Sequence, residues 1–505
     1  MGAVITALQQ HARSQPHAPA INTGTTYLTY QALLRQVDAL GKLLASQPLR
    51  NVALMLDNGP AWVVIDLAAQ QAGMTLVPLP GFFSDEQIRH SLHDAGVELL
   101  ITDQGERFPS FKANTSLSDQ FKQLLPAGTG LSVFNTAIEQ ERRHLTGIAK
   151  ITYTSGTTGN PKGVCLDQHS IDTVSQALVQ ASRITAADRH LSVLPLATLL
   201  ENIGGVYAPL MAGACCLLPS LQQVGMQGAT QLDVVKLHHA LMKFKATTTI
   251  FIPQILQALL GLLATGKNTL PHLRFVAVGG APVSQTLLGQ AEALGLPVFQ
   301  GYGLSECGSV VAVNTPAHNK PGSVGKPLPH IQLSFAADNE ILVQGCHCQG
   351  YLGQPFTSGN EPYATGDIGY LDDEGYLYIT GRKKNMFITS FGRNVSPEWI
   401  EQELTLQPEI LQAVVFGEAL PWNSAVIVAN NNATAEQLAL AVERANQPLP
   451  DYARVGTWLK ADQAFSVANQ QYTGTGRPRR QPIWQYYADR IFRFYEQPST
   501  QEVSS

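Results

Sequence analysis

The chain contains little charge and little cysteine. Of its 505 residues, 14% are Asp, Glu, Lys or Arg, and 33 basic against 38 acidic residues give a formal net charge of −5. Because basic residues are not in excess, nothing indicates a nucleic-acid partner. The six cysteines lie mostly in apolar surroundings without the spacing of a disulfide framework, which indicates a reducing compartment.

Long apolar runs and targeting signals are also missing. No stretch approaches the roughly 18 apolar residues that a membrane-spanning helix requires, so we expect no transmembrane segment. Residues 1–15 show no basic cluster before an apolar core and no small-residue cleavage site, which predicts a cytoplasmic protein without a signal peptide. Cys346, His347 and Cys348 have the chemistry of metal ligands, but no second Cys/His pair accompanies them, so we interpret them as ordinary strand residues.

The chain is instead rich in alternating strand-like and helix-like segments. This alternation runs from residue 27 to about residue 300 and predicts parallel sheets with helices on both faces; its size predicts two packed α/β sheet subdomains. Short runs broken by Gly, Pro and Asp over 322–380 predict a small β-rich module. We therefore predict a large N-terminal domain over residues 1–382 and a small α+β C-terminal domain over 383–505.

Individual helices can also be predicted. Leucine and valine at spacings of three and four predict an amphipathic helix over 27–47, capped by Thr29, and a second apolar helix over 199–212. Aromatic residues at near-helical spacing in the tail 481–505 predict packing on the C-terminal domain, or else contact with a partner or a membrane surface.

One stretch, Tyr-Thr-Ser-Gly-Thr-Thr-Gly-Asn-Pro-Lys-Gly at 153–163, has the chemistry of a phosphate-binding loop. Its glycines let backbone N–H groups approach an anion, its hydroxyls donate hydrogen bonds, and Lys162 supplies a positive charge. It is not a Walker A sequence, because Pro161 precedes the lysine and Gly163 follows it. Apolar runs on both sides predict that the loop joins two strands. A flexible surface turn is the alternative interpretation.

Other glycine-rich segments follow predicted strands, where open α/β sheets bind ligands. Residues 278–282 end one strand and residues 300–306 end the next, with Tyr302 available to stack on a base and Glu306 suited to Mg²⁺. The segment 363–367 presents a carboxylate beside a glycine, as ribose-binding loops do. The charged segment 381–385 is either a hinge or a solvated turn.

In this order, these segments resemble the adenylate-forming (AMP-binding) superfamily, over residues 10 to about 483. Residues 194–201 and 449–455 resemble most closely the long-chain acyl-CoA synthetases. The resemblance implies a ligase that converts a carboxylate and ATP to an acyl-adenylate and pyrophosphate. The small C-terminal domain then rotates, and the acyl group passes to a thiol.

The resemblance also implies roles for individual residues. Reaction roles fall on Lys162, Glu306 (also the Mg²⁺ ligand), Lys384 (the pivot between domains) and Arg477. ATP-binding roles fall on Thr154, Ser155, Gly156, Thr157, Thr158, Gly159, Gly280, Ala281, Pro282, Tyr302, Gly303, Asp367 and Arg382. Gly392 is expected beside the tunnel of the thiol. Asp367 is expected on the ribose hydroxyls, and Arg382 on the ribose or the phosphate.

Two residues depart from the family pattern. Thr198 stands where these enzymes usually have a histidine that helps to form the carboxylate end of the acyl pocket. Arg477 stands where a lysine normally bridges the carboxylate and the adenylate oxygen, and Arg479 and Arg480 follow closely. Arginine keeps the charge but has a broad, planar fork, so the exchange is not automatically conservative.

The sequence thus predicts ATP-dependent activation of a carboxylic acid, a medium- or long-chain fatty acid, and its transfer to coenzyme A. Two alternatives stay open. In the first, the acceptor is the phosphopantetheine thiol of an acyl carrier protein instead of coenzyme A. In the second, which Arg477 and Thr198 suggest, the chain is a nucleotide-binding protein with impaired ligase activity.

Overall fold

The computed structural model describes residues 2–126, 129–136, 145–154, 161–228, 231–266, 268–345, 348–356, 361–390, 393–430, 433–473 and 477–496. The chain forms two compact units. The first consists of Met1–Gly280, Ala291–Ser334 and Val343–Tyr363, and the second of Ala281–Gln290, Phe335–Leu342 and Ala364–Ser505. Residues 364–382 thus belong to the second unit, whereas the predicted domain boundary follows Arg382. The hinge expected at this boundary stays a prediction.

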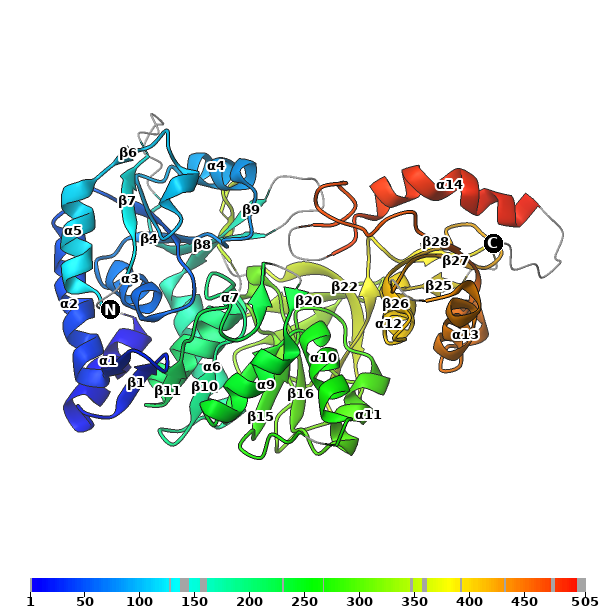
Figure 1. The fold of residues 1–505 in the computed structure, drawn as a ribbon, viewed down its shortest axis with the longest axis horizontal. Coiled ribbons are helices and arrows are strands. Elements are labelled where there is room, and N and C mark those ends of the chain that lie inside the picture. The colour runs from blue at the N-terminus through cyan, green and yellow to red at the C-terminus, as the bar shows by residue number, and fades with distance from the viewer. Residues whose placement is uncertain are drawn as a thin grey trace. The chain divides into compact units, whose positions relative to one another are not determined.

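The first unit contains two large sheets, as the alternating pattern predicted (Figure 1). One sheet runs, in spatial order, β21 (Gly350–Tyr351), β9 (Lys162–Asp167), β8 (Ile148–Thr154), β4 (Thr75–Pro78), β3 (Asn51–Met55), β5 (Leu99–Thr102), β7 (Ser132–Asn135) and β6 (Lys112–Ala113). Its strands β4, β3 and β5 pair in parallel, and β8 and β9 form an antiparallel hairpin.

The other large sheet carries the longest series of parallel strands. It runs β18 (Lys326–Pro327), β17 (Ala312–Val313), β16 (Val298–Tyr302), β15 (Phe275–Val278), β14 (Thr248–Phe251), β10 (Arg189–Leu191), β11 (Cys215–Leu217), β1 (Pro19–Asn22) and β2 (Tyr27–Thr29). Pairing is parallel from β16 through β1. The carboxyl ends of β14, β15 and β16 therefore open at one edge, which is where the glycine-rich segments follow.

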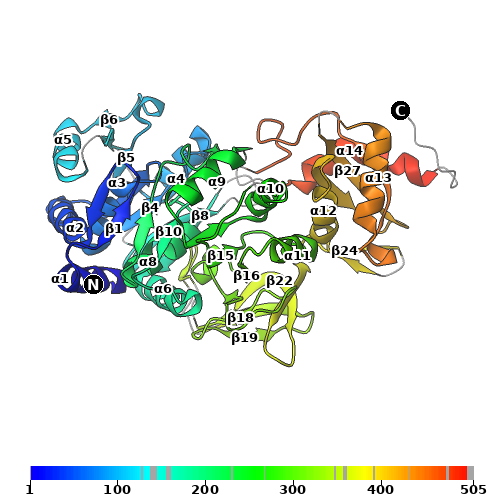
Figure 2. The ribbon, with the colours of Figure 1, turned by 60° about the horizontal axis from the view of Figure 1, so that its bottom comes forward.

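Helices cover these sheets because their apolar faces must be buried. They are α1 (Ala3–Ser14), α2 (Tyr30–Ala45), α3 (Pro60–Gln71), α4 (Asp85–Asp94), η1 (Gly105–Arg107), α5 (Thr115–Leu124), α6 (Gln168–Ser182), α7 (Leu199–Glu201), η2 (Asn202–Tyr207), α8 (Ala208–Met211), α9 (Val234–Lys243), α10 (Pro253–Leu263) and η3 (Ser305–Cys307). For example, α3 packs on β3 and β4, and α10 packs on β14 beside α9 (Figure 2).

Two helix predictions need correction. Residues 27–29 form strand β2, and the helix α2 begins at Tyr30; Thr29 caps it by accepting a hydrogen bond from the Ala32 N–H at 3.2 Å. Residues 199–212 do not form one regular α-helix, because η2, a π-helix, separates α7 from α8. The strand alternation around both segments is as predicted.

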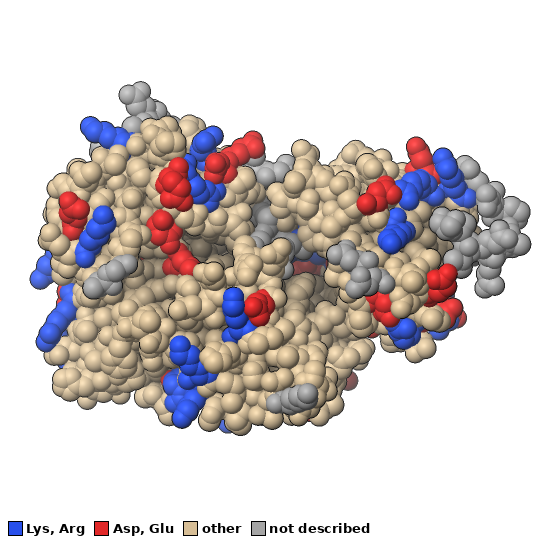
Figure 3. Space-filling model, viewed as in Figure 1, with Lys and Arg blue, Asp and Glu red and all other residues tan. Residues whose placement is uncertain are grey.

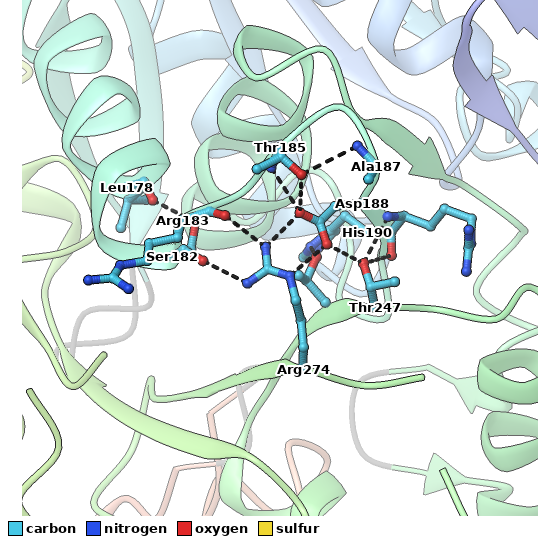
Figure 4. A network of polar contacts seen from close by, with 11 residues as sticks. Leu178, Ser182, Arg183, Thr185, Ala187, Asp188, His190, Thr247 and Arg274 are labelled. Carbon is cyan, nitrogen blue, oxygen red and sulfur yellow. Dashed lines mark hydrogen bonds and ion pairs between the residues drawn. The ribbon is translucent and has the colours of Figure 1, made fainter. Parts of the chain in front are cut away.

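A polar network fixes the amino-terminal ends of three parallel strands (Figure 4). Asp188, Thr247 and Arg274 immediately precede β10, β14 and β15. The Asp188 carboxylate accepts hydrogen bonds from Arg274 Nε at 2.7 Å, Arg274 Nη2 at 2.6 Å and Thr247 Oγ1 at 2.8 Å. Arg274 Nη1 donates to the carbonyl of Ser182 at the end of α6. This network lies at the strand ends opposite to the glycine-rich segments.

The second unit contains smaller sheets and helices. These elements are β19 (Gln332–Phe335), β20 (Glu340–Gln344), β22 (Tyr363–Leu371) and β23 (Leu377–Arg382) in one sheet; β24 (Phe387–Ile388) and β25 (Asn394–Val395) in a hairpin; β26 (Ile410–Phe416), β27 (Asn423–Ala429) and β28 (Val455–Lys460) in a third; and α11 (Gln285–Ala293), α12 (Pro397–Thr405), α13 (Ala435–Asn446), η4 (Asp451–Ala453) and α14 (Arg480–Glu496). Some of them extend into the first unit.

The aromatic tail forms α14 and packs within the second unit, as predicted. Ile483, Tyr487 and Ile491 are buried in a core with Val414 and Val426 of the sheet β26-β27-β28. Charged side chains are sparse on the face drawn in Figure 3, where large areas carry neither acidic nor basic groups. No helix in the described part of the chain combines the length and hydrophobicity needed to span a membrane.

Candidate active site

The β8–β9 hairpin carries the predicted phosphate-binding loop. Thr154 ends β8 and pairs with Lys162, the first residue of β9, so the loop joins two strands as expected. Gly163 must be a glycine here, because a Cβ at that position would lie 2.9 Å from Ile151 Cγ2. The hairpin geometry therefore presents Lys162 at the exposed end of a buried strand. The loop residues Ser155, Gly156, Thr157, Thr158 and Gly159 lie outside the described residues.

Further residues of the predicted site lie at the ends of β15 and β16. Gly280 has φ +80°, a left-handed conformation that favours glycine. Gly303 follows Tyr302, and a Cβ on it would overlap the Ser309 carbonyl, so the chain turns back tightly there. Glu306 lies on the short helix η3 that follows. Ala281 and Pro282, predicted to flank the adenine, belong to the second compact unit.

Glu306 lies in a cluster that sequence analysis did not find. Tyr351 Oη donates a hydrogen bond to Glu306 Oε1 at 2.7 Å, and Tyr363 Oη lies 3.2 Å from Tyr351 Oη. Lys162 Nζ lies 5.4 Å from the centroid of the Tyr351 ring. Burial raises the pKa of Tyr351 to about 12, and burial together with Glu306 raises that of Tyr363 further. Both hydroxyls therefore stay protonated and able to donate.

The loop before α7 carries Thr198, the first departure from the family pattern. Thr198 Oγ1 donates to the Pro195 carbonyl at 2.6 Å, so the hydroxyl turns back onto its own loop. Asn58, which lies elsewhere in the chain, fixes the same loop. Asn58 Nδ2 donates to the Leu194 carbonyl and Asn58 Oδ1 accepts from the Leu196 N–H, both at 2.8 Å. The loop that carries Thr198 is thus held by one hydrogen bond within the loop and by two from Asn58.

Glu201 and His190 form a hydrogen-bonded pair that also contacts this loop. His190 Nε2 lies 3.2 Å from Glu201 Oε1, and His190 Nδ1 lies 2.9 Å from Thr248 Oγ1. The Leu194 N–H donates to the other oxygen of Glu201 at 3.3 Å. A Cβ on Gly205 would overlap Glu201 Oε1, so this glycine makes room for the pair. A glutamate inside an apolar helix was the only sequence signal of this arrangement.

A buried ion pair joins the β8–β9 hairpin to α3, and hydrogen bonds from the same lysine reach the π-helix η2. Lys150 of β8 contacts Asp66 Oδ1 at 2.8 Å, Tyr207 Oη at 2.9 Å and Asn202 Oδ1, and Tyr207 Oη also donates to Asp66 Oδ2 at 2.6 Å. Burial lowers the pKa of Lys150, whereas Asp66 opposes that change. Because Asn202 and Tyr207 both reach the same lysine, their five-residue spacing suits a π-helix better than an α-helix.

The second unit holds the residues predicted for the ribose. Asp367 and Arg382 pair across β22 and β23, with Arg382 Nε 2.9 Å from Asp367 Oδ1, and Arg382 Nη1 also donates to the Thr365 carbonyl at 3.0 Å. The neighbouring Lys383 forms ion pairs with Asp338 and Glu340 at 2.6 and 2.7 Å. Lys384 is exposed in the turn that follows β23. Gly392 lies outside the described residues.

The C-terminal residues Arg480 and Arg477 have different surroundings. Arg480 begins α14 and is bound in a fork to Glu401, with Nη1–Oε1 at 2.6 Å and Nη2–Oε2 at 2.7 Å. Arg480 is therefore a structural residue. Arg477 is exposed, and its backbone forms a small turn with Thr473 at 2.8 and 3.1 Å. The role predicted for Arg477 stays a prediction.

The chain is similar to known proteins over most of its length. The AMP-binding enzyme family matches residues 8–352, and the AMP-binding enzyme C-terminal domain matches residues 384–499. The chain is 29% identical to an oxalate–CoA ligase of Arabidopsis thaliana, over 81% of this chain and 84% of the relative. It is 27% identical to the long-chain-fatty-acid–CoA ligase FadD15 of Mycobacterium bovis, over 72% and 70%.

Solved structures of similar fold exist as well. The o-succinylbenzoate coenzyme A synthetase of Bacillus subtilis, solved with ATP and a magnesium ion, superposes with a TM-score of 0.72 at 22% identity. The match covers 94% of this chain and 98% of that protein. The likeness confirms the predicted fold class, with a large N-terminal domain and a small C-terminal domain.

Proposed function

The chain belongs to the AMP-binding enzyme family, and we propose that it uses ATP to activate a carboxylic acid as an acyl-adenylate and then forms an acyl-coenzyme A thioester. The observation that carries the proposal is that Tyr351 contacts both Lys162 and Glu306. A cation that follows a glycine-rich loop and a carboxylate suited to Mg²⁺ are the two groups that phosphoryl chemistry on ATP requires. The relatives named above are CoA ligases.

The residues of the first unit fit a magnesium ion bound together with ATP. Mg²⁺ is commonly held by one or two carboxylates plus phosphate oxygens, and Glu306 supplies such a carboxylate. When bound, Mg²⁺ would neutralise negative charge that develops on the phosphates. Lys162 would bind the β- and γ-phosphate oxygens, and Tyr302 would stack on the adenine. Asp367 and Arg382 would hold the ribose, for which their present ion pair offers both an acceptor and a donor.

In the first half-reaction, an oxygen of the carboxylate attacks the α-phosphorus of ATP and the bond to pyrophosphate breaks. The protein contributes mainly position and positive charge, and Arg477 would orient the carboxylate. In the second half-reaction, a thiol with a pKa near ~8.5 is already partly ionised at neutral pH, so the thiolate displaces AMP without a strong base. Lys384 would be the pivot about which the small C-terminal domain rotates between the two half-reactions.

We propose a medium- or long-chain fatty acid as the substrate. The loop and helices over residues 192–212 contain no lysine or arginine that could bind a second carboxylate, and Leu199, Ile203 and Val206 are buried there. These features favour an acid with one carboxylate and an apolar tail over a dicarboxylate such as oxalate. Thr198 in place of histidine leaves a smaller side chain at the carboxylate end.

The test is formation of acyl-CoA from fatty acids of increasing length, oxalate, o-succinylbenzoate and anthranilate, measured by mass spectrometry of the products. We expect thioesters of the fatty acids and little product from oxalate. A carrier protein bearing phosphopantetheine, offered in place of coenzyme A, tests the alternative acceptor. Preference for a dicarboxylate would contradict the proposed substrate, and preference for the carrier would contradict the proposed acceptor.

A further inference from the structure

We infer that Tyr351 is a positioning residue that holds the phosphate-binding lysine and the metal-binding carboxylate in one arrangement before ATP arrives. The inference rests on the proposed function, because it takes Lys162 and Glu306 as the groups that meet ATP and Mg²⁺. The two groups belong to different parts of the chain, and Tyr351 contacts both.

The ring and the hydroxyl of Tyr351 have separate tasks. Lys162 Nζ lies 5.4 Å from the ring centroid, within the range in which an aromatic face attracts a cation. The hydroxyl donates to Glu306 Oε1 at 2.7 Å and lies 3.2 Å from Tyr363 Oη. A carboxylate with one oxygen fixed by a hydroxyl keeps its orientation and presents its other oxygen to a metal ion.

The backbone places Tyr351 independently of these side chains. Strand β21 pairs with β9, so that Tyr351 lies opposite Val164, and the Leu352 N–H donates to the Gly163 carbonyl at 2.8 Å. The Cys348 N–H donates to the carbonyl of Glu306 itself at 2.5 Å. The short segment 348–352 is therefore fastened both to the strand that begins at Lys162 and to the helix that carries Glu306.

The test compares binding of ATP by titration calorimetry with Mg²⁺ and with EDTA, for wild type, Tyr351→Phe and Tyr351→Leu. Tyr351→Phe keeps the ring and removes the hydroxyl, so we expect Mg²⁺·ATP to bind about tenfold more weakly while binding in EDTA is unchanged. Tyr351→Leu also removes the ring, so binding in EDTA should weaken too.

Tyr30→Phe is the matched control, because it removes a buried tyrosine hydroxyl that donates to the Ala214 carbonyl at 2.8 Å elsewhere in the first unit. Equal effects of Tyr30→Phe and Tyr351→Phe on Mg²⁺·ATP binding would overturn the inference. Because binding is measured directly, wild-type binding without adenylation would refute the proposed function alone, and the comparison of variants would still decide the role of Tyr351.

Discussion

At the scale of single residues, we propose that Arg477 orients the carboxylate in the first half-reaction. The guanidinium cannot lose its proton, and its fork is wider than an ammonium group, but it carries a positive charge that would attract a carboxylate as its oxygen attacks the α-phosphorus. Arg480, three residues away, is bound to Glu401 and is not available for this task. Of these two arginines, Arg477 is the one to test.

We expect Arg477→Ala to slow adenylation by about 10²-fold, because a cation aimed at developing charge typically contributes that much. Arg477→Lys should stay within about tenfold of wild type, since the charge is kept. The measurement is single-turnover formation of acyl-adenylate. Thioester formation from supplied acyl-adenylate should be unchanged in both variants. The control Arg479→Ala tests a neighbouring charge, and an equal loss there would show that Arg477 has no special position.

Single residues also mark the limit of prediction from the sequence. The sequence indicated Lys162 and Glu306, because their types and neighbours are unusual. Tyr351 could not be found, because Glu306 lies 45 residues away and only the pairing of β21 with β9 brings the strand to Lys162. Similarly, Asn58 reaches Leu194 across 136 residues. Contacts of this kind depend on tertiary structure, which local patterns do not encode.

At the scale of elements, the strand starts of the parallel sheet depend on Asp188. Burial alone would raise the pKa of Asp188, but hydrogen bonds from Arg274, Thr185 and Thr247 lower it below its ordinary value of 3.8. A carboxylate with a lowered pKa in the folded state stabilises that state above the pKa of the unfolded chain. This stabilisation is lost as the pH falls through the folded-state pKa.

We therefore expect Asp188→Asn to lower the free energy of unfolding by about 1–3 kcal/mol at pH 7. The difference from wild type should shrink as the pH falls below about 4, because the unfolded chain then binds a proton that the folded Asp188, with its lowered pKa, still releases. Urea unfolding from pH 7 to pH 3, followed by tryptophan fluorescence, measures both quantities. A difference that stays constant over this range would contradict the ionised role of Asp188.

In the second unit, helices α12 and α14 are joined by Glu401 and Arg480. Both side chains are largely buried, and the Glu401 carboxylate also accepts a hydrogen bond from the Val415 N–H at 2.7 Å. Arg480→Met would leave Glu401 buried without its partner, which typically costs about 3–5 kcal/mol. Urea unfolding of Arg480→Met should show that loss. The double change Glu401→Gln with Arg480→Met should recover part of it; no recovery would contradict this explanation.

The elements show which patterns are sufficient for prediction. The alternation of strand-like and helix-like segments predicted the two sheets, and the near-helical spacing of aromatic residues predicted the packing of α14, because burial of one face requires apolar residues at fixed spacing. The π-helix η2 escaped prediction, since Asn202 and Tyr207 contact Lys150 and Asp66, which are distant in the sequence. The start of α2 was placed three residues too early, although its cap, Thr29, was identified.

At the scale of the whole molecule, the two units divide the predicted machinery. The first unit holds Lys162, Tyr302 and Glu306, and the second holds Asp367, Arg382, Lys384 and Arg477. We propose that the ligase reaction needs both, with the first unit binding phosphate and metal and the second supplying the ribose contacts, the pivot and the cation for the carboxylate. A nucleotide-binding protein without ligase activity would need only the binding contacts.

The exchange of labelled pyrophosphate into ATP, with and without a carboxylic acid, tests the central claim most directly. We predict exchange that depends on Mg²⁺ and on a fatty acid and that is lost in Lys162→Ala. Mg²⁺·ATP binding without exchange in the presence of fatty, aromatic or dicarboxylic acids would contradict adenylation. That result would make the chain a nucleotide-binding protein.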